Sequence, residues 1–167
     1  MLNSPRFDGR FLVVWSTVTA IGYALGWFGG FVFGHLVGEV AVAVGVGLSV
    51  GICQWSILRH RLPDASYWIT STLIGMATAS VVRLGLWQIA GLPIDASWPN
   101  GMLTNMAAYF VGGSLIGFLQ TNRWPTLEQR APWKWVIVSG VAWALSILGF
   151  GIPPDMSVSP DLPVAFV

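Results

Sequence analysis

Apolar residues run along this chain in long segments that charged residues and loops separate. A helix that crosses a bilayer needs about 20 predominantly apolar residues, and several segments of the chain reach that size. They are residues 11–34, 36–58, 65–90, 102–120 and 133–152. Because these segments are apolar on all faces and not along one stripe, they differ from the helices of a soluble bundle. The pattern predicts an all-α fold, an integral membrane bundle of about five transmembrane helices.

The segments predict one transmembrane domain over residues 1–154 and an extramembrane tail over residues 155–167. The pair Pro153-Pro154 is expected to end the fifth helix, since proline cannot continue a helix. The first two spans are expected to meet in a tight glycine-rich turn near Gly29-Gly30 or near Gly34. Composition agrees with a lipid environment. Only 9% of the 167 residues are charged, against about 25% in a typical soluble domain.

The positions of the cations predict the orientation. Five spans place seven of the eight basic residues on one side and leave Arg83 on the other. The seven are Arg6, Arg10, Arg59, Arg61, Arg123, Arg130 and Lys134. Because positive loops are retained in the cytoplasm, we expect the N-terminus inside and the C-terminus outside. No basic stretch is suited to phosphate contacts, so nucleic acid is not an expected partner.

Tryptophans gather near the ends of the predicted spans, where amphipathic indoles settle at bilayer interfaces. On the basic side these are Trp15, Trp55, Trp68, Trp124, Trp133 and Trp135. We interpret them as an anchoring belt. Trp143 is the exception, because it lies in the middle of the fifth span.

The second and fourth spans carry the same pattern, two glycines four positions apart and a glutamine three positions later. The residues are Gly47, Gly51 and Gln54 in the second span and Gly113, Gly117 and Gln120 in the fourth. The first and third spans also match, at a constant offset of 53 positions that aligns Trp15 with Trp68. The fifth span opens similarly at Trp135. We therefore predict two parallel-repeat helical hairpins followed by a fifth helix.

Residues at i, i+4 and i+7 share one helix face, so each glycine pair forms a groove that ends in a glutamine. In lipid, close backbone approach and interhelical hydrogen bonds drive association. The motif therefore indicates helix packing, with Gln54 and Gln120 each bonding a neighbouring helix. The alternative is a small polar ligand held between the two glutamines.

The segment Gly51-Ile52-Cys53-Gln54-Trp55-Ser56-Ile57-Leu58-Arg59, followed by Leu62-Pro63 and Trp68, resembles small polytopic membrane proteins of cyanobacteria and similar bacteria. Those proteins are similar in carrying repeated Gly-x-x-x-Gly-x-x-Gln-Trp helices followed by an arginine-containing cytoplasmic turn. The second copy departs from that pattern, with Thr121 in place of the tryptophan. The resemblance implies an architecture and no activity.

One polar cluster is expected at the outer interface, formed by His35, Glu39, Arg83 and Gln88. His35 and Glu39 are four positions apart and share a face if the segment is helical. An ion pair between Glu39 and Arg83 is the simplest interpretation. We predict no metal site, because two further ligands are missing, and no catalytic residues, so the protein is not expected to be an enzyme.

Three functions are compatible with these features. The first is a small non-catalytic accessory or assembly subunit of a larger membrane complex. A specific version is an accessory subunit of a photosynthetic pigment–protein complex that contacts chlorophyll or carotenoid, with His35 as an axial ligand. The third function is that of a small oligomeric transporter or channel with a polar site near Gln54 and Gln120.

The expected partners are the lipid bilayer and either other membrane subunits or further copies of the chain. Lipid is the expected bound molecule, with pigment as the alternative through His35. The expected location is a bacterial plasma membrane or a thylakoid-type membrane.

Overall fold

A computed structural model describes residues 9–62, 64–92, 100–122 and 132–149. Its helices are α1 (Gly9–Leu58), α2 (Tyr67–Ala90), α3 (Asn100–Thr121) and α5 (Pro132–Gly149). Gly38 has non-helical backbone angles and divides α1 into two helices, which we call the N-terminal arm and the C-terminal arm. The described residues contain five helices and no strand, which confirms the predicted all-α class.

Four of the helices are long and apolar enough to cross a membrane. The N-terminal arm contributes Gly9–Gly30, the C-terminal arm contributes Val40–Leu58, and α2 and α3 qualify over their whole lengths. The apolar part of α5, Pro132–Leu148, is shorter. Residues 150–152 of the predicted fifth span and the predicted tail at 155–167 lie outside the described residues.

The turn between the first two spans lies at Gly38, so its prediction near Gly29-Gly30 or Gly34 is wrong. Gly38 has φ 75° and ψ 168°, a backbone conformation that is essentially restricted to glycine. Gly30 is instead helical, and a Cβ at that position would collide with Val42 of the C-terminal arm. The glycines of the N-terminal arm thus allow close packing, and the reversal of direction falls further along the chain.

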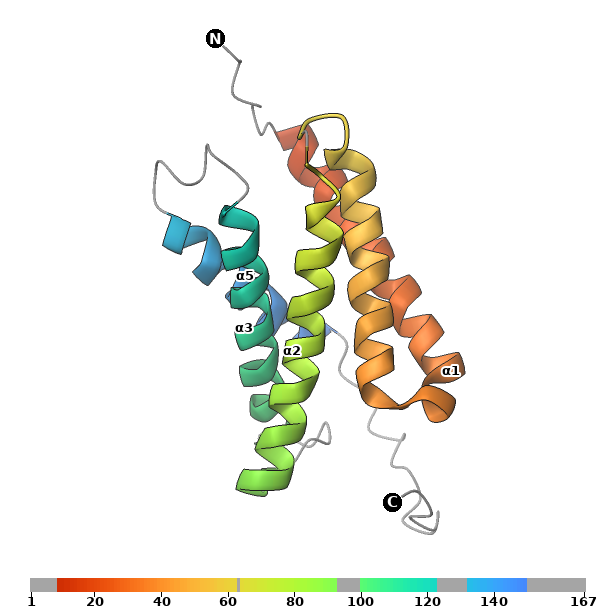
Figure 1. Cartoon of the computed structure of the whole chain (residues 1–167), viewed down its shortest axis with the longest axis vertical. Coiled ribbons are helices and arrows are strands. Elements are labelled where there is room, and N and C mark those ends of the chain that lie inside the picture. The colour runs from red at the N-terminus through yellow and green to blue at the C-terminus, as the bar shows by residue number, and fades with distance from the viewer. Residues whose placement is uncertain (1–8, 63, 93–99, 123–131, 150–167) are drawn as a thin grey trace.

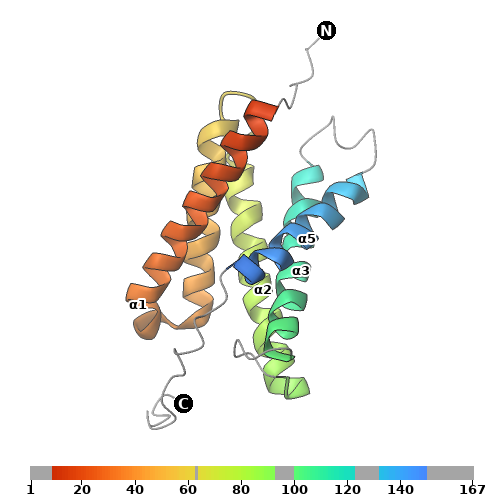
Figure 2. The same cartoon turned by 180° about the vertical axis from the view of Figure 1, so that it is seen from behind.

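The helices pack in chain order (Figures 1 and 2). The two arms of α1 lie side by side and are joined at the lower end of Figure 1. Backbone contacts between the labelled helices link α1 with α2, α2 with α3 and α3 with α5. In Figure 2, the N-terminal arm and α5 both lie on the side toward the viewer. The first and last helices are therefore neighbours on one side of the bundle, where the rings of Tyr23 and Trp143 lie 6.0 Å apart.

Local signals account for where α2 ends. Gly91 follows Ala90 with φ 65° and ψ 18°, the left-handed conformation that commonly ends helices. The backbone N–H groups after the helix donate to its last turn, from Gly91 to Trp87 and from Leu92 to Leu86. Carbonyls at the end of the helix therefore find partners within the chain.

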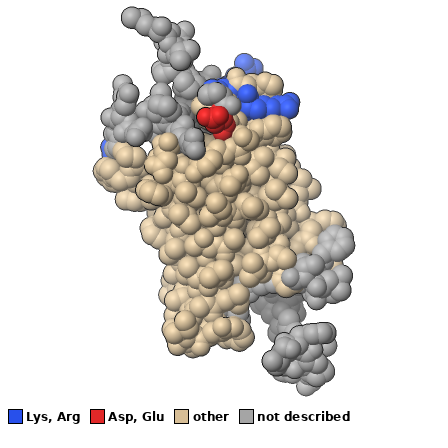
Figure 3. All heavy atoms as spheres, viewed as in Figure 1, with Lys and Arg blue, Asp and Glu red and all other residues tan. Residues whose placement is uncertain are grey.

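On the face shown in Figure 3, charged side chains gather at one end, above a broad uncharged surface. We call this the basic end and define it by Arg59 and Arg61. The Arg61 guanidinium lies 4.7 Å from the ring centroid of Phe11, and that of Arg59 lies 5.2 Å from Trp55. Large apolar side chains such as Phe28 and Ile89 are exposed below it. An uncharged band with exposed apolar side chains is the surface that a helical protein presents to lipid.

Candidate functional site

Gln54 joins three helices near the basic end. It lies on the C-terminal arm and is 7% exposed. Its Oε1 accepts a hydrogen bond from Nε1 of Trp68 on α2, at 2.9 Å. Its Nε2 donates to Oγ1 of Thr19 on the N-terminal arm, at 3.0 Å. Both polar atoms of this buried amide are therefore used within the protein, as a polar group away from water requires.

Gln120 makes a matching bond at the end of α3. Its Oε1 accepts from Nε1 of Trp135 on α5, at 3.1 Å, and the Gln120 side chain is almost fully buried. Trp68 follows Gln54 by 14 positions, and Trp135 follows Gln120 by 15. The same bond thus links a helix to the helix that follows it in two places, and each glutamine serves a different interface.

The two glycines that precede Gln54 lie against α2. A Cβ on Gly51 would stand 2.9 Å from the Cα of Ile69, and one on Gly47 would stand 3.0 Å from the Cβ of Met76. Any side chain larger than a hydrogen atom would push the two helices apart at these points. The C-terminal arm therefore approaches α2 closely along the face that ends in Gln54.

The two glycines that precede Gln120 lie against α5 in the same manner. A Cβ on Gly117 would stand 2.9 Å from the Cα of Val136, and one on Gly113 would stand 2.7 Å from the Cβ of Trp143. Glycine-mediated backbone approach followed by a glutamine–tryptophan bond therefore occurs at both interfaces.

Several hydroxyl groups in the spans bond to their own helix. In α2, Ser71 and Thr72 both donate to the carbonyl of Trp68, at 3.0 and 2.8 Å. In α3, Thr104 donates to Asn100 and Thr121 to Phe118. Such bonds to the preceding turn satisfy a hydroxyl in an apolar environment without a partner helix.

The tryptophan belt predicted on the basic side needs a correction at Trp68. This indole is 4% exposed and belongs to a buried cluster with Phe11, Leu58 and Ala65. Trp15 meets it edge to face, with ring centroids 5.8 Å apart. Trp68 is buried because Gln54 accepts its N–H inside the bundle, which removes its need for water.

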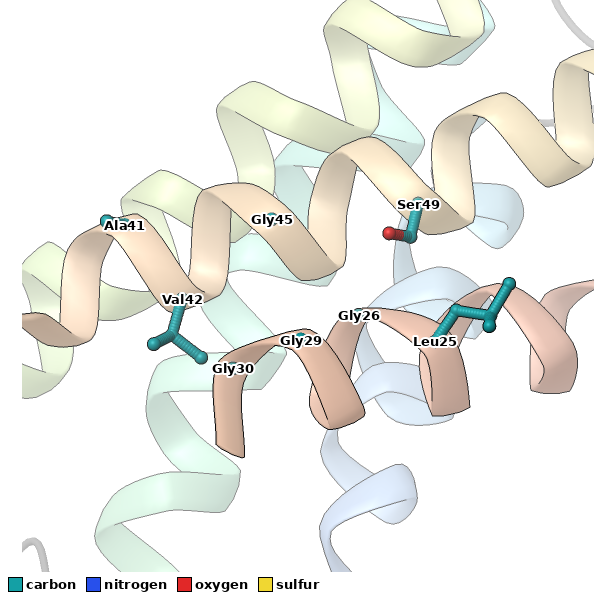
Figure 4. Close-up of a pocket in the computed structure, with 8 residues that line it drawn as sticks. All are labelled: Leu25, Gly26, Gly29, Gly30, Ala41, Val42, Gly45 and Ser49. Carbon is teal, nitrogen blue, oxygen red and sulfur yellow. The ribbon is translucent and has the colours of Figure 1, made fainter. Parts of the chain in front are cut away.

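A shallow groove of about 240 Å³ opens between the two arms of α1 (Figure 4). Its lining is mostly small and apolar, and Ser49 supplies the polar side chain drawn in Figure 4. Gly29 and Gly45 line it, and a Cβ on either would meet no atom within 4 Å. The groove therefore lies beside the close contacts of Gly26 with Val46 and of Gly30 with Val42, where the neighbouring glycines leave space between the arms.

The predicted outer polar cluster stays a prediction, because half of its side chains lie outside the described part of the structure. The side chains of His35 and Glu39 lie outside the described part of the structure. Gly38 stands between them with non-helical angles, so the shared helical face expected for this pair does not apply. Arg83 is partly buried on α2, and Gln88 is exposed on the same helix. Within the described residues, no group of three or more His, Cys, Asp or Glu side chains could hold a metal ion.

Sequence reasoning identified the glutamines but missed their partners Thr19, Trp68 and Trp135. The signal that could have found the tryptophans is the near-constant spacing of 14 and 15 positions from each glutamine. Comparisons with protein-family models, with curated proteins and with solved structures gave no match.

Proposed function

We propose that this chain is a non-catalytic integral membrane protein that acts as an accessory or assembly subunit of a larger membrane complex. The observation that carries the proposal is the use of Gln54. Both of its amide atoms bond neighbouring helices, so the polar group that could have bound a ligand instead holds the bundle together. This use favours helix packing over a ligand site between Gln54 and Gln120.

The extent of exposed apolar surface supports a partner as well as lipid. Large apolar side chains are exposed on every helix, among them Val13, Val81, Leu103 and Val138. Lipid can cover such a surface, and so can the helices of another membrane protein. Because the interior of this small chain is used for helix packing, its outer faces are the surfaces available to bind a partner protein.

The basic end is proposed to face the cytoplasm, with the N-terminus inside. Arg10, Arg59 and Arg61 lie at this end, and cationic loops are retained on the cytoplasmic side. Single cysteines introduced at His60 and at Gln88, in a Cys53→Ser background, test this in right-side-out vesicles. We expect an impermeant maleimide to label the Gln88 position and to spare the His60 position. Labelling of the His60 position alone would reverse the orientation.

The subunit function is tested by purification from the native membrane. A chain with an affinity tag, extracted in a mild detergent, is separated by native gel electrophoresis and its companions are identified by mass spectrometry. We expect a complex with at least one stoichiometric membrane protein partner. A monodisperse protomer without a partner, in two detergents of different stringency, would overturn the proposed function.

A further inference from the structure

Three helices of the bundle place matching residues in its interior. Tyr23 of the N-terminal arm, Met76 of α2 and Trp143 of α5 belong to one cluster. The separations along the chain are 53 and 67 positions, and the same separations relate Trp15, Trp68 and Trp135. Those three tryptophans also pack in one cluster, near the basic end. We call the N-terminal arm, α2 and α5 the inner helices.

The other two helices, the C-terminal arm and α3, each lie between two inner helices, and we call them the outer helices. On one side, Gly22 lies against Val50 and Gly75 lies against Ile116. These pairs match, because Gly75 follows Gly22 by 53 positions and Ile116 follows Val50 by 66. Each outer helix therefore covers the same face of the inner helix that precedes it.

The outer helices cover their other neighbours in a matching way too. Gly51 lies against Ile69 of α2, and Gly117 lies against Val136 of α5. Among the described helices, only α2 has an outer helix on both sides. The N-terminal arm is covered on one side by the C-terminal arm, and α5 is covered on one side by α3.

A third outer position therefore exists between α5 and the N-terminal arm. Among the described residues no helix occupies it, and the backbones of α1 and α5 do not come into contact. Its inner edge is closed, because the rings of Tyr23 and Trp143 lie 6.0 Å apart. We call the exposed surface along this position the open flank; its residues are Ser16, Ala20, Val138 and Ala142.

Burial separates the open flank from the covered interfaces. On α5, Val138 is 57% exposed, whereas its counterpart on α2, Ser71, is fully buried. Ala142 is exposed, whereas Gly22 and Gly75 at the matching positions are buried. Three of the four residues on this flank are small, namely Ser16, Ala20 and Ala142, as are Gly22 and Gly75 where the outer helices pack. The surface thus has the composition of a helix interface and lacks the helix.

We propose that the open flank binds a transmembrane helix of a partner protein that carries a Gly-x-x-x-Gly-x-x-Gln pattern. This proposal rests on the proposed subunit function and specifies where the partner docks. The bound helix would run in the direction of the two outer helices, with its glutamine toward the basic end. We assign the position to a partner and not to residues 150–167, whose four prolines and two aspartates disfavour a spanning helix.

One polar side chain stands where the glutamine of that helix would lie. Trp15 occupies the position of Trp68 and Trp135, whose indole N–H groups donate to Gln54 and Gln120. Ser139 occupies the position of Thr19, which accepts from Gln54, but it is buried with its Cβ against Gly117 of α3 and so belongs to the covered interface. The glutamine would accept from Trp15, which repeats the bond that Trp68 donates to Gln54.

The chain itself supplies a probe for this site. In the native packing, the Cβ of Cys53 would stand 3.1 Å from a Cβ at Gly22, and the position on α5 that matches Gly22 is Ala142. A separate segment of residues 36–62 is co-expressed with the full chain bearing Cys53→Ser and Ala142→Cys. The arginines at the C-terminal end of the segment favour the required orientation. Val141→Cys is the matched control, because it is exposed at the same depth but turned by about 100°.

We expect a disulfide-linked adduct of the segment with the Ala142→Cys chain, at least fivefold above the Val141→Cys chain. Because a lost interhelical hydrogen bond costs little in lipid, Trp15→Phe in the chain or Gln54→Leu in the segment should lower the yield about three- to tenfold. Combining the two should lower it little further. Either equal yields at the two cysteines or an adduct insensitive to Trp15→Phe would overturn the proposal. Disulfides between two full chains at Ala142→Cys without the segment would also overturn it, since a second copy would then cover the flank.

This outcome is distinguishable from that of the purification experiment. If the segment forms an adduct with the Ala142→Cys chain but the purification finds no native partner, the helix-binding flank is supported and the subunit function is rejected. A native partner with no adduct would retain the subunit function and show that docking occurs elsewhere.

Discussion

The bond between Gln54 and Trp68 offers the sharpest test of how the bundle is held together. Both side chains are almost fully buried, and Nε1 of Trp68 lies 2.9 Å from Oε1 of Gln54. Gln54→Leu keeps most of the side-chain volume and removes both bonds of the amide. Trp68→Phe keeps an aromatic ring and removes the indole donor. The double variant completes a thermodynamic cycle for the pair.

The expected magnitude follows from what the variants leave behind. An interhelical hydrogen bond in lipid contributes about 0.6 kcal/mol on average and up to about 1.7. Gln54→Leu removes two such bonds, and these values already include the cost of a partner left unpaired, because they come from double-variant cycles. We expect Gln54→Leu to lower the free energy of unfolding by about 1–3 kcal/mol. Once the amide is gone, the N–H of Trp68 is itself a liability, so Trp68→Phe should cost less in that background.

The assay is unfolding in mixed micelles by titration with a denaturing detergent, followed by far-ultraviolet circular dichroism. Gln88→Leu is the control, because Gln88 is exposed on α2, and it should change the free energy of unfolding by less than about 0.5 kcal/mol. The coupling energy of the Gln54–Trp68 pair should be about 0.6–1.7 kcal/mol. Strictly additive effects, or a Gln54→Leu variant as stable as Gln88→Leu, would refute the reasoning.

Three further predictions use the same unfolding assay. Gly75→Ala should lower the free energy of unfolding by about 1–3 kcal/mol, because its Cβ would stand 2.6 Å from the carbonyl oxygen of Gly112. Gly85→Ala on the same helix is the control, because its Cβ would meet no atom within 4 Å and the change should be neutral or stabilising. Equal effects of the two variants would contradict the close approach of α2 and α3. Gly38→Ala should lower the free energy of unfolding by about 1–3 kcal/mol, because alanine rarely adopts the positive φ of this position, whereas the control Gly45→Ala should not lower it. A Gly38→Ala variant as stable as the unchanged protein would place the turn elsewhere. Trp143→Ala should lower the free energy of unfolding by about 3–5 kcal/mol, because this ring packs on Gly113 and Tyr23. Trp133 is 60% exposed, so Trp133→Ala should lower it by less than about 1 kcal/mol. A larger effect at Trp133 would mean that the other face of α5 packs against the bundle.

The sequence predicted the long helices well where their ends carry a local signal. The segments 65–90 and 102–120 correspond to Tyr67–Ala90 and Asn100–Thr121 within a few residues. Charged residues, prolines and glycines bound these segments, and such residues act on the backbone or on burial whatever the tertiary context. Local chemistry was therefore sufficient for helix length.

The first turn was misplaced because glycine serves two purposes in this chain. Gly30 and Gly38 look alike in the sequence, but Gly30 is packed against Val42 and only Gly38 has a positive φ. Which glycine turns the chain depends on how the two arms face each other, and that is a property of the packed pair. The partners of Gln54 and Gln120 escaped prediction for the same reason, because they depend on the register between neighbouring helices.

The division between inner and outer helices explains why the polar groups are placed as they are. In lipid the hydrophobic effect does not distinguish one helix pairing from another, so pairing depends on shape and on hydrogen bonds. Glycines on the outer helices permit close approach to many apolar surfaces, which makes shape alone a weak guide. A glutamine at the end of each glycine face adds a condition, because it finds its acceptor and donor only where a tryptophan or a hydroxyl lies at the correct depth, as Trp68 and Thr19 do for Gln54. The same condition would let the open flank reject helices that have the small residues but lack the glutamine, since such a helix would bury the Trp15 indole without an acceptor.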